Sequence, residues 1–107
     1  MKWNVLMTDT AKSDLREIAL YIHDRSGDAE TAASFVMALQ EQCMALEAFP
    51  ERGAIPKDYV LKALGYRYLV YQHYLIFYLT DSANHTVYIH AFFNEKQDSF
   101  RHMRKRI

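Results

Sequence analysis

The feature that most constrains the fold is the aromatic stretch at residues 65–93, in the second half of the chain. It contains three runs rich in aromatic and β-branched residues, which fit a pleated sheet, at residues 66–72, 74–80 and 86–93. The two gaps are short and hold turn-forming residues, so they suit hairpins better than parallel crossovers. The sequence therefore predicts three consecutive antiparallel strands, with the largely apolar middle strand covered on both faces.

Two amphipathic helices are predicted upstream of these strands, after a short strand at residues 3–8. The first helix can be capped by the polar residues 8–10, and it ends near Gly27, which can take the left-handed C′ position. We expect the second helix to reach about Phe49, because Pro50 disfavours helix at the residue before it. On the first helix, the pattern separates an apolar face from a charged face: Ala11, Leu15, Ile18, Ala19 and Ile22 against Lys12, Asp14, Arg16 and Glu17.

The resulting element order is β-α-α-β-β-β, which places the chain in the α+β class. We expect a two-layer single domain over residues 1–107, with a helical hairpin covering one face of an antiparallel sheet. Residues 51–64 contain Gly and Pro and predict a surface loop, with room for a helical turn at 59–64. The second face would carry more aromatic surface than a monomer usually exposes, so we expect a partner there. The aromatic side chains predicted for that face are Tyr66, Tyr68, Tyr71, Tyr74, Tyr78, Tyr88 and Phe92.

Charge is balanced over the whole chain but not along it. The 13 Lys and Arg residues equal the 13 Asp and Glu residues, which gives no signal for nucleic-acid binding by the molecule as a whole. Residues 95–107 contain five basic and two acidic side chains, so positive charge gathers in a basic C-terminal tail.

The cysteine, histidine and apolar residues indicate the cellular compartment and whether a metal or cofactor is expected. Cys43 is the only cysteine, so an internal disulfide is excluded and a reducing cytoplasm is the simplest compartment. The histidines lack the spacing of metal ligands, and we expect neither a metal nor a cofactor. The N-terminus does not resemble a signal peptide, and no run approaches the ~20 apolar residues that a membrane span needs. We therefore expect no membrane association.

Four short motifs are spread over nearly the whole chain. DLREI stands at residues 14–18, FPERG at 49–53, GYRYLV at 65–70 and YLIFY at 74–78. Together with the element order, these motifs resemble the RelE/ParE superfamily of toxins from bacterial type II toxin–antitoxin operons. The ParE-like branch is favoured because the last strand leads into a short charged segment, FFNEKQD at residues 92–98.

The resemblance implies one of two activities. RelE-like members are ribosome-dependent endoribonucleases whose active site lies on the sheet face without the hairpin, whereas ParE-like members inhibit DNA gyrase without cutting RNA. Attack of a 2′-OH on its phosphodiester needs a base, an acid and cations for the phosphorane charge. By motif position, Arg67 stands where the ribonucleases carry a basic residue, but Leu75 and Asn94 stand where others are expected, and no tyrosine follows Phe93. Most of the catalytic set is therefore missing. If the chain is a ribonuclease, its catalytic candidates are Arg67, Lys96, Arg101 and His102.

A second ribonuclease arrangement, that of the YoeB-like members, combines a glutamate base with a C-terminal histidine and an aromatic residue. Here His102 is followed by Met103, and the upstream carboxylates with loop freedom are Glu51 and Asp58. This arrangement fits the sequence poorly.

The basic tail has two interpretations. Its cations could simply stabilise a helix end through the helix dipole, or they could form a contact surface for the target. Under the ParE-like interpretation, the tail helps to bind gyrase, with Phe100 and Met103 holding it to the sheet. The candidate target-binding residues are Arg67, Lys96, Phe100, Arg101, Arg104, Lys105 and Arg106.

The resemblance also implies a cognate antitoxin, whose disordered C-terminal segment would fold on the toxin by strand addition or as a helix in a groove. We expect the helical hairpin and the sheet edge to receive it. The favoured function is a toxin that inhibits DNA gyrase and is neutralised by its antitoxin. The alternatives are a ribosome-dependent mRNA endonuclease and an inactive binding module that acts only in an antitoxin complex.

Overall fold

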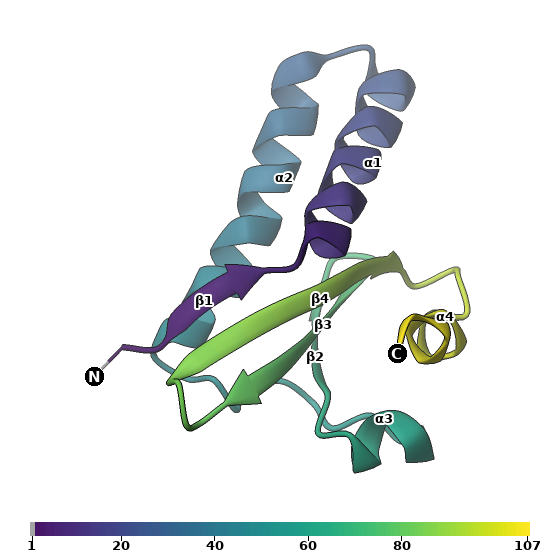
Figure 1. Cartoon of the computed structure of the whole chain (residues 1–107). Coiled ribbons are helices and arrows are strands. Elements are labelled where there is room, and N and C mark those ends of the chain that lie inside the picture. The colour runs from purple at the N-terminus through teal and green to yellow at the C-terminus, as the bar shows by residue number, and fades with distance from the viewer. Residues whose placement is uncertain (1) are drawn as a thin grey trace.

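The computed structural model describes residues 2–107, and its centre is a four-stranded sheet (Figure 1). Its strands are β1 (Asn4–Met7), β2 (Arg67–Tyr71), β3 (Tyr74–Asp81) and β4 (Thr86–Asn94), in the spatial order β1-β4-β3-β2. The last three form the predicted antiparallel meander, with β3 inside the sheet. β1 lies parallel to β4, so the sheet is mixed and not antiparallel throughout. The α+β class is confirmed, but the direction of β1 could not be predicted, because its partner lies at the far end of the chain.

Two helices between β1 and β2 form the predicted hairpin: α1 (Asp9–Ser26) and α2 (Ala29–Met44). Gly27 ends α1 in the left-handed region, with φ of 69°, as expected from its place in the sequence. α2 ends earlier than predicted, because the chain tightens into a 3-10 turn, η1 (Ala45–Glu47), before Pro50 is reached.

Thr8 caps the first turn of α1, since its side-chain oxygen accepts a hydrogen bond from the Ala11 N–H at 3.1 Å. Replacing Thr8 by alanine should lower the free energy of unfolding by ~1 kcal/mol, because this N–H loses its partner. Urea unfolding followed by circular dichroism measures the change. Thr10→Ala is the matched control, because Thr10 is exposed on the same turn and its replacement should change stability by less than about 0.5 kcal/mol. An equal loss in the control would contradict the capping role.

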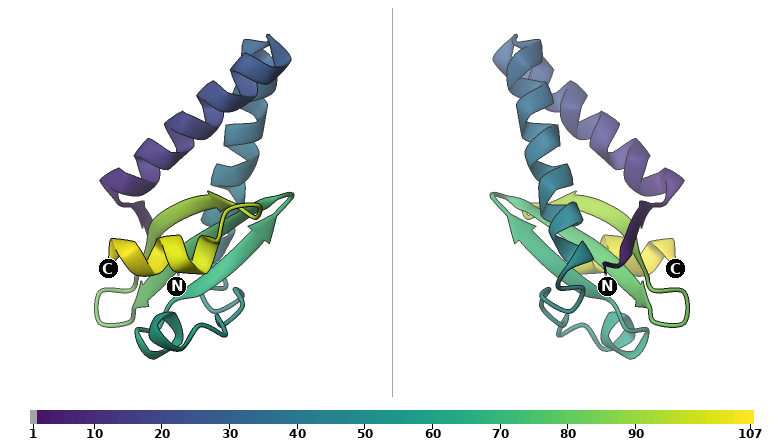
Figure 2. Two further views of the ribbon diagram at one scale, coloured as in Figure 1. Left: turned by 90° about the vertical axis from the view of Figure 1, so that its right-hand side faces the viewer. Right: turned by 90° about the vertical axis from the view of Figure 1, so that its left-hand side faces the viewer.

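The hairpin packs on one face of the sheet and buries the first hydrophobic cluster (Figure 2). Leu39 of α2 and Ile76 of β3 are fully buried in it. Four aromatic side chains predicted for the second face contribute to this cluster instead: Tyr71, Tyr74, Tyr78 and Phe92. For Phe92 the reason is a β-bulge in β4, where Ala91 pairs with Phe77 and Ile89 with Tyr78, which leaves His90 unpaired and reverses the alternation of faces along β4.

The second face of the sheet is covered by two short helices, α3 (Tyr59–Ala63) and α4 (Ser99–Arg106) (Figure 2). Leu61 of α3 and Met103 of α4 are fully buried in a second cluster around Phe77. The Phe100 ring packs edge-on against Tyr68 and Phe77, at 5.4 Å and 5.7 Å between ring centres. The prediction that Phe100 and Met103 hold the tail to the sheet is confirmed, whereas the prediction of an open aromatic face is wrong.

No helix within residues 2–107 is both long enough and apolar enough to cross a membrane.

Candidate partner-binding site

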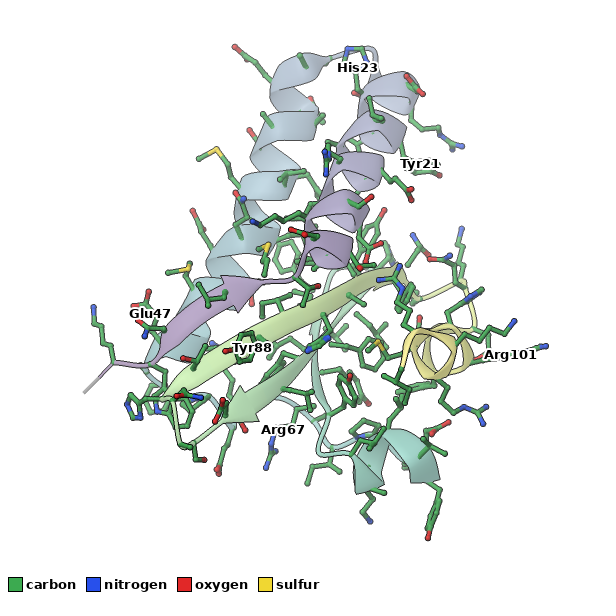
Figure 3. All side chains as sticks on the ribbon, viewed as in Figure 1. Tyr21, His23, Glu47, Arg67, Tyr88 and Arg101 are labelled. Atoms are coloured by element: carbon green, nitrogen blue, oxygen red, sulfur yellow. The ribbon has the colours of Figure 1, made fainter. Side chains whose placement is uncertain are left out.

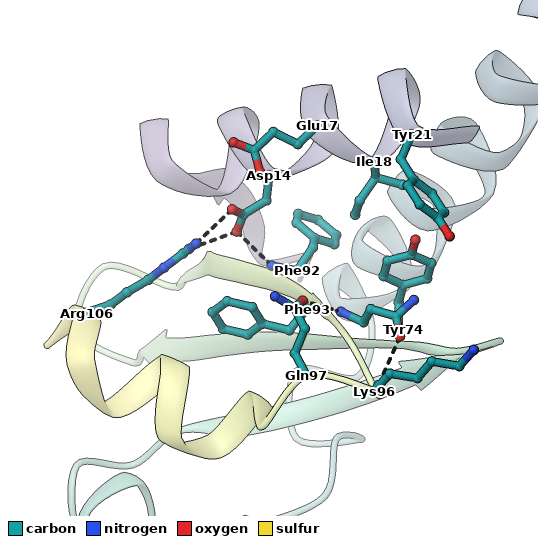
Figure 4. Close-up of a pocket in the computed structure, with 11 residues that line it drawn as sticks. Asp14, Glu17, Ile18, Tyr21, Tyr74, Phe92, Phe93, Lys96, Gln97 and Arg106 are labelled. Atoms are coloured by element: carbon teal, nitrogen blue, oxygen red, sulfur yellow. Dashed lines mark hydrogen bonds and ion pairs between the residues drawn. The ribbon is translucent and has the colours of Figure 1, made fainter. Parts of the chain in front are cut away.

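A pocket of about 530 Å³ lies between α1, the end of β4 and the turn that leads to α4 (Figure 4). Ile18 of α1 and Tyr74 of β3 provide apolar surface in it, and Tyr21 lies beside them with 53% of its surface exposed. Glu17 and Lys96 add one charge of each sign. Such a mixture suits the apolar side chain of a peptide, flanked by polar contacts that fix its orientation.

Asp14 closes one end of this pocket and is only 8% exposed. Its Oδ2 accepts hydrogen bonds from the Phe92 N–H at 3.0 Å and from Arg106 Nη1 at 2.8 Å, while its Oδ1 accepts one from Arg106 Nη2 at 2.8 Å. The hydrogen bonds that Arg106 donates to Asp14 raise the pKa of Arg106 above its ordinary value. The C-terminal end of α4 is therefore fastened to α1.

The opposite flank of α4 is tied to α3. Arg104 Nε lies 2.9 Å from Oδ2 of Asp58, whose other carboxylate oxygen caps α3. Arg106, on the flank of α4 that faces α1, makes a further contact within the chain. Its guanidinium carbon lies 4.7 Å from the centre of the Phe93 ring, a cation–π contact. Two of the cations predicted to bind the target, Arg104 and Arg106, are thus engaged within the chain.

The other tail cations point into solvent. Arg101, Lys105 and Lys96 have exposed side chains, and none forms an ion pair or side-chain hydrogen bond within the part of the chain that the structure describes. Figure 3 shows Arg101 directed away from the sheet. His102 is exposed too, with its ring tilted against Phe93 at 5.9 Å between centres. These side chains are accessible to a partner.

Arg67 lies apart from the tail residues, toward the other end of β3. It pairs with Tyr78, whereas Asn94, two residues before Lys96, pairs with Tyr74. Four residues of strand span roughly 13 Å, so the two cations start from distant points of the sheet. The Arg67 guanidinium donates to two main-chain carbonyls of the loop before α3. The structure therefore does not gather Arg67 with Lys96, Arg101 and His102 into one catalytic cluster.

The described residues do not favour metal binding or thiol chemistry. Within residues 2–107, no three His, Cys, Asp or Glu side chains gather in a way that could hold a metal ion. Cys43 is fully buried, and this burial raises the pKa of its thiol to about 12, which keeps it in the unreactive form.

Sequence reasoning missed the structural roles of three residues: Asp14 beside the pocket, and Gly53 and Tyr78 where the loop before α3 meets β3. The position of Asp14 indicated its burial. It stands three residues after Ala11 and four before Ile18, on the apolar stripe of α1 and not on the charged face where it was predicted. A carboxylate at such a position needs a buried partner. For Gly53 and Tyr78 the sequence contains no such indication, because the hydrogen bond from the Gly53 N–H to the Tyr78 hydroxyl joins residues that are distant in the chain.

The sequence matches the family model described as ParE toxin of type II toxin-antitoxin system, parDE, over residues 5–99. The chain belongs to this ParE toxin family. The match confirms the resemblance to the RelE/ParE superfamily and the preference for its ParE-like branch. Among curated protein sequences, none matches this ParE-family chain.

Solved toxin–antitoxin structures contain chains with the same fold. One is from the toxin–antitoxin complex RelBE2 of Mycobacterium tuberculosis, with a TM-score of 0.65, 22% sequence identity, and coverage of 88% of this chain and 92% of that chain. Another is from the chromosomal ParDE TA system of P. aeruginosa, with a TM-score of 0.72, 20% identity, and coverage of 87% and 96% respectively. At these identities the likeness is one of fold, and it extends to both a RelE-type and a ParE-type system.

Proposed function

We propose that this ParE-family toxin inhibits DNA gyrase in the cytoplasm and that a cognate antitoxin neutralises it. The observation that carries this proposal is the position of α4. In ribonuclease members of the superfamily, the active site occupies the sheet face opposite the helical hairpin. Here Met103 and Phe100 pack on that face against Phe77, so α4 covers surface that would have to be open for RNA to bind there.

The residues at the expected catalytic positions support the same proposal. Leu75 is buried in the second hydrophobic cluster, where a ribonuclease would need a cation facing the phosphate. Arg67 donates its hydrogen bonds to main-chain carbonyls, and the end of β4 at Asn94, from which Lys96 follows, lies roughly 13 Å away along the sheet. Because a phosphorane needs several charges close together, this arrangement favours a binding role over RNA cleavage.

The pocket beside α1 supports an antitoxin partner. An amphipathic helix could place an apolar side chain against Ile18, Tyr21 and Tyr74, with a basic group near Glu17 and an acidic group near Lys96. The solved neighbours of this fold come from toxin–antitoxin systems, which supports a partner of this kind.

A gyrase assay tests the proposal. Purified toxin added to DNA gyrase and relaxed plasmid should block supercoiling or trap cleaved DNA, and the same toxin should leave mRNA intact in a translation assay with programmed ribosomes. Normal supercoiling at excess toxin would refute the gyrase target. Cleavage of mRNA at the A site, abolished by Arg67→Ala, would establish the endonuclease instead. If neither assay shows an effect and expression of the toxin does not slow growth, the inactive binding module is the remaining interpretation.

A further inference from the structure

The FPERG motif forms a loop at residues 49–54 that neither the pocket nor the tail accounts for. Tyr78 of β3 is fully buried beneath this loop. Its hydroxyl accepts a hydrogen bond from the Gly53 N–H at 2.9 Å and donates one to the Pro50 carbonyl at 2.7 Å. One buried side chain therefore fixes both halves of the loop.

Strand β2 provides a second set of contacts. Arg67 Nη1 donates to the carbonyls of Glu51 at 3.2 Å and Gly53 at 3.0 Å. Ala54 and Tyr68 exchange two main-chain hydrogen bonds, at 2.8 Å and 2.9 Å. All of these bonds end on main-chain atoms of the loop, so they set its shape without using its side chains.

The side chains that the loop presents are left accessible. Phe49 is 69% exposed, and Ile55, just after the loop, is 53% exposed. Glu51 and Arg52 are also exposed, beside an open hollow of about 430 Å³ that includes Phe49 and Pro50. A rigid loop loses little conformational entropy on binding, and exposed aromatic and arginine side chains are the types that dominate binding energy at protein interfaces.

We infer that the 49–54 loop is a docking element for the protein target, with Phe49 entering an apolar site and Arg52 facing a carboxylate beside it. This inference rests on the proposed function, under which the target is DNA gyrase. It adds a contact surface on the side of the molecule where β2 begins, separate from the tail cations and from the pocket beside α1.

The loop suits a folded protein better than the other partners. A nucleic acid would favour an excess of cations, whereas Glu51 and Arg52 balance each other. An antitoxin segment that adds a strand would need the free edge of β2, and at Tyr68 that edge is already occupied by Ala54. Binding to a preformed apolar site on a folded protein requires neither an excess of cations nor a free strand edge.

The test compares toxin variants in gyrase supercoiling with purified gyrase and relaxed plasmid. The double variant Phe49→Ala/Arg52→Ala should raise the half-inhibitory concentration by roughly 30-fold or more, the effect of losing one binding hot spot. Both side chains are exposed, so the variant should keep the thermal midpoint of the wild type. The matched control is Leu20→Ala/Lys12→Ala, which removes an exposed apolar side chain and an exposed cation from α1 and should stay within about two-fold of the wild type.

The outcomes separate this inference from the proposed function. If the wild type blocks supercoiling and Phe49→Ala/Arg52→Ala blocks it equally well, the docking role is wrong and the gyrase target stands. If the wild type leaves supercoiling unchanged at excess, both the docking role and the gyrase target are wrong.

A gel-shift experiment with the same plasmid and no gyrase tests whether the loop binds DNA instead. Plasmid binding that the double variant abolishes would identify DNA as the partner and overturn the inference.

Discussion

Replacing Gly53 by alanine should lower the free energy of unfolding by roughly 3 kcal/mol. A Cβ at this position would lie 2.6 Å from Tyr78 Oη, 2.8 Å from Tyr78 Cε1 and 2.9 Å from the Tyr68 carbonyl oxygen. Neither neighbour can move cheaply, because Tyr78 is fully buried and the Tyr68 carbonyl accepts the Ala54 N–H. The new methyl group therefore forces the loop away from the strands and breaks the hydrogen bonds that Tyr78 makes to it.

Urea unfolding followed by circular dichroism measures this loss, and Gly27→Ala is its control. Gly27, unlike Gly53, lies in the left-handed region, with φ of 69°, but nothing lies within 4 Å of the position its Cβ would take. Its replacement should therefore cost only the ~1 kcal/mol of left-handed backbone strain. A loss at Gly53 no larger than the loss at Gly27 would show that the close approach to Tyr78 is not what requires glycine.

The meander and the helical hairpin could be predicted because their signals are local. Aromatic and β-branched runs separated by turn residues mark strands, and Gly27 marks the end of a helix wherever the rest of the chain lies. The cover on the second face could not be predicted in the same way. α4 is mostly charged, and only Phe100 and Met103 indicate a side that can be buried. The bulge at His90 places Ala91 and Phe93 of β4 on this face, and such a bulge is a property of strand pairing.

The tail cations were proposed as target contacts from their residue type alone, and their partners within the chain could not be predicted. Arg104 and Arg106 are as basic in the sequence as Arg101 and Lys105, so charge alone places all four in the same group. The structure divides them, because Arg104 and Arg106 reach carboxylates on α3 and α1 while the other two extend into solvent. Such pairings join residues far apart in the chain, and local patterns contain no information about them.

Asp14→Ala should lower the free energy of unfolding by about 3 kcal/mol. The buried Asp14 carboxylate accepts from both the Phe92 N–H and the Arg106 guanidinium, so its removal leaves a main-chain donor without its partner and frees the end of α4. Hydrogen exchange locates the effect. Amides of α4 should exchange faster in the variant by more than the loss of global stability explains, whereas amides of α2 should follow the global change alone.

Two arginine variants distinguish the anchor at Asp14 from the ion pair on the other flank of α4. Arg106→Gln leaves the Asp14 carboxylate, on a side chain that is only 10% exposed, without its counter-charge, and it should cost roughly 1–2 kcal/mol. Arg104→Gln removes an arginine that is more exposed, at 48% against 29% for Arg106. The Asp58 side chain that remains is 14% exposed and still accepts the N–H groups of Val60 and Leu61, so the cost should stay below about 1 kcal/mol. Equal losses in the two variants would contradict the role assigned to burial of Asp14. If Arg106→Gln costs more than Arg104→Gln, α4 is held on the sheet by Met103 and by its attachment to α1, and the half-exposed Arg104 adds little through its pair with Asp58.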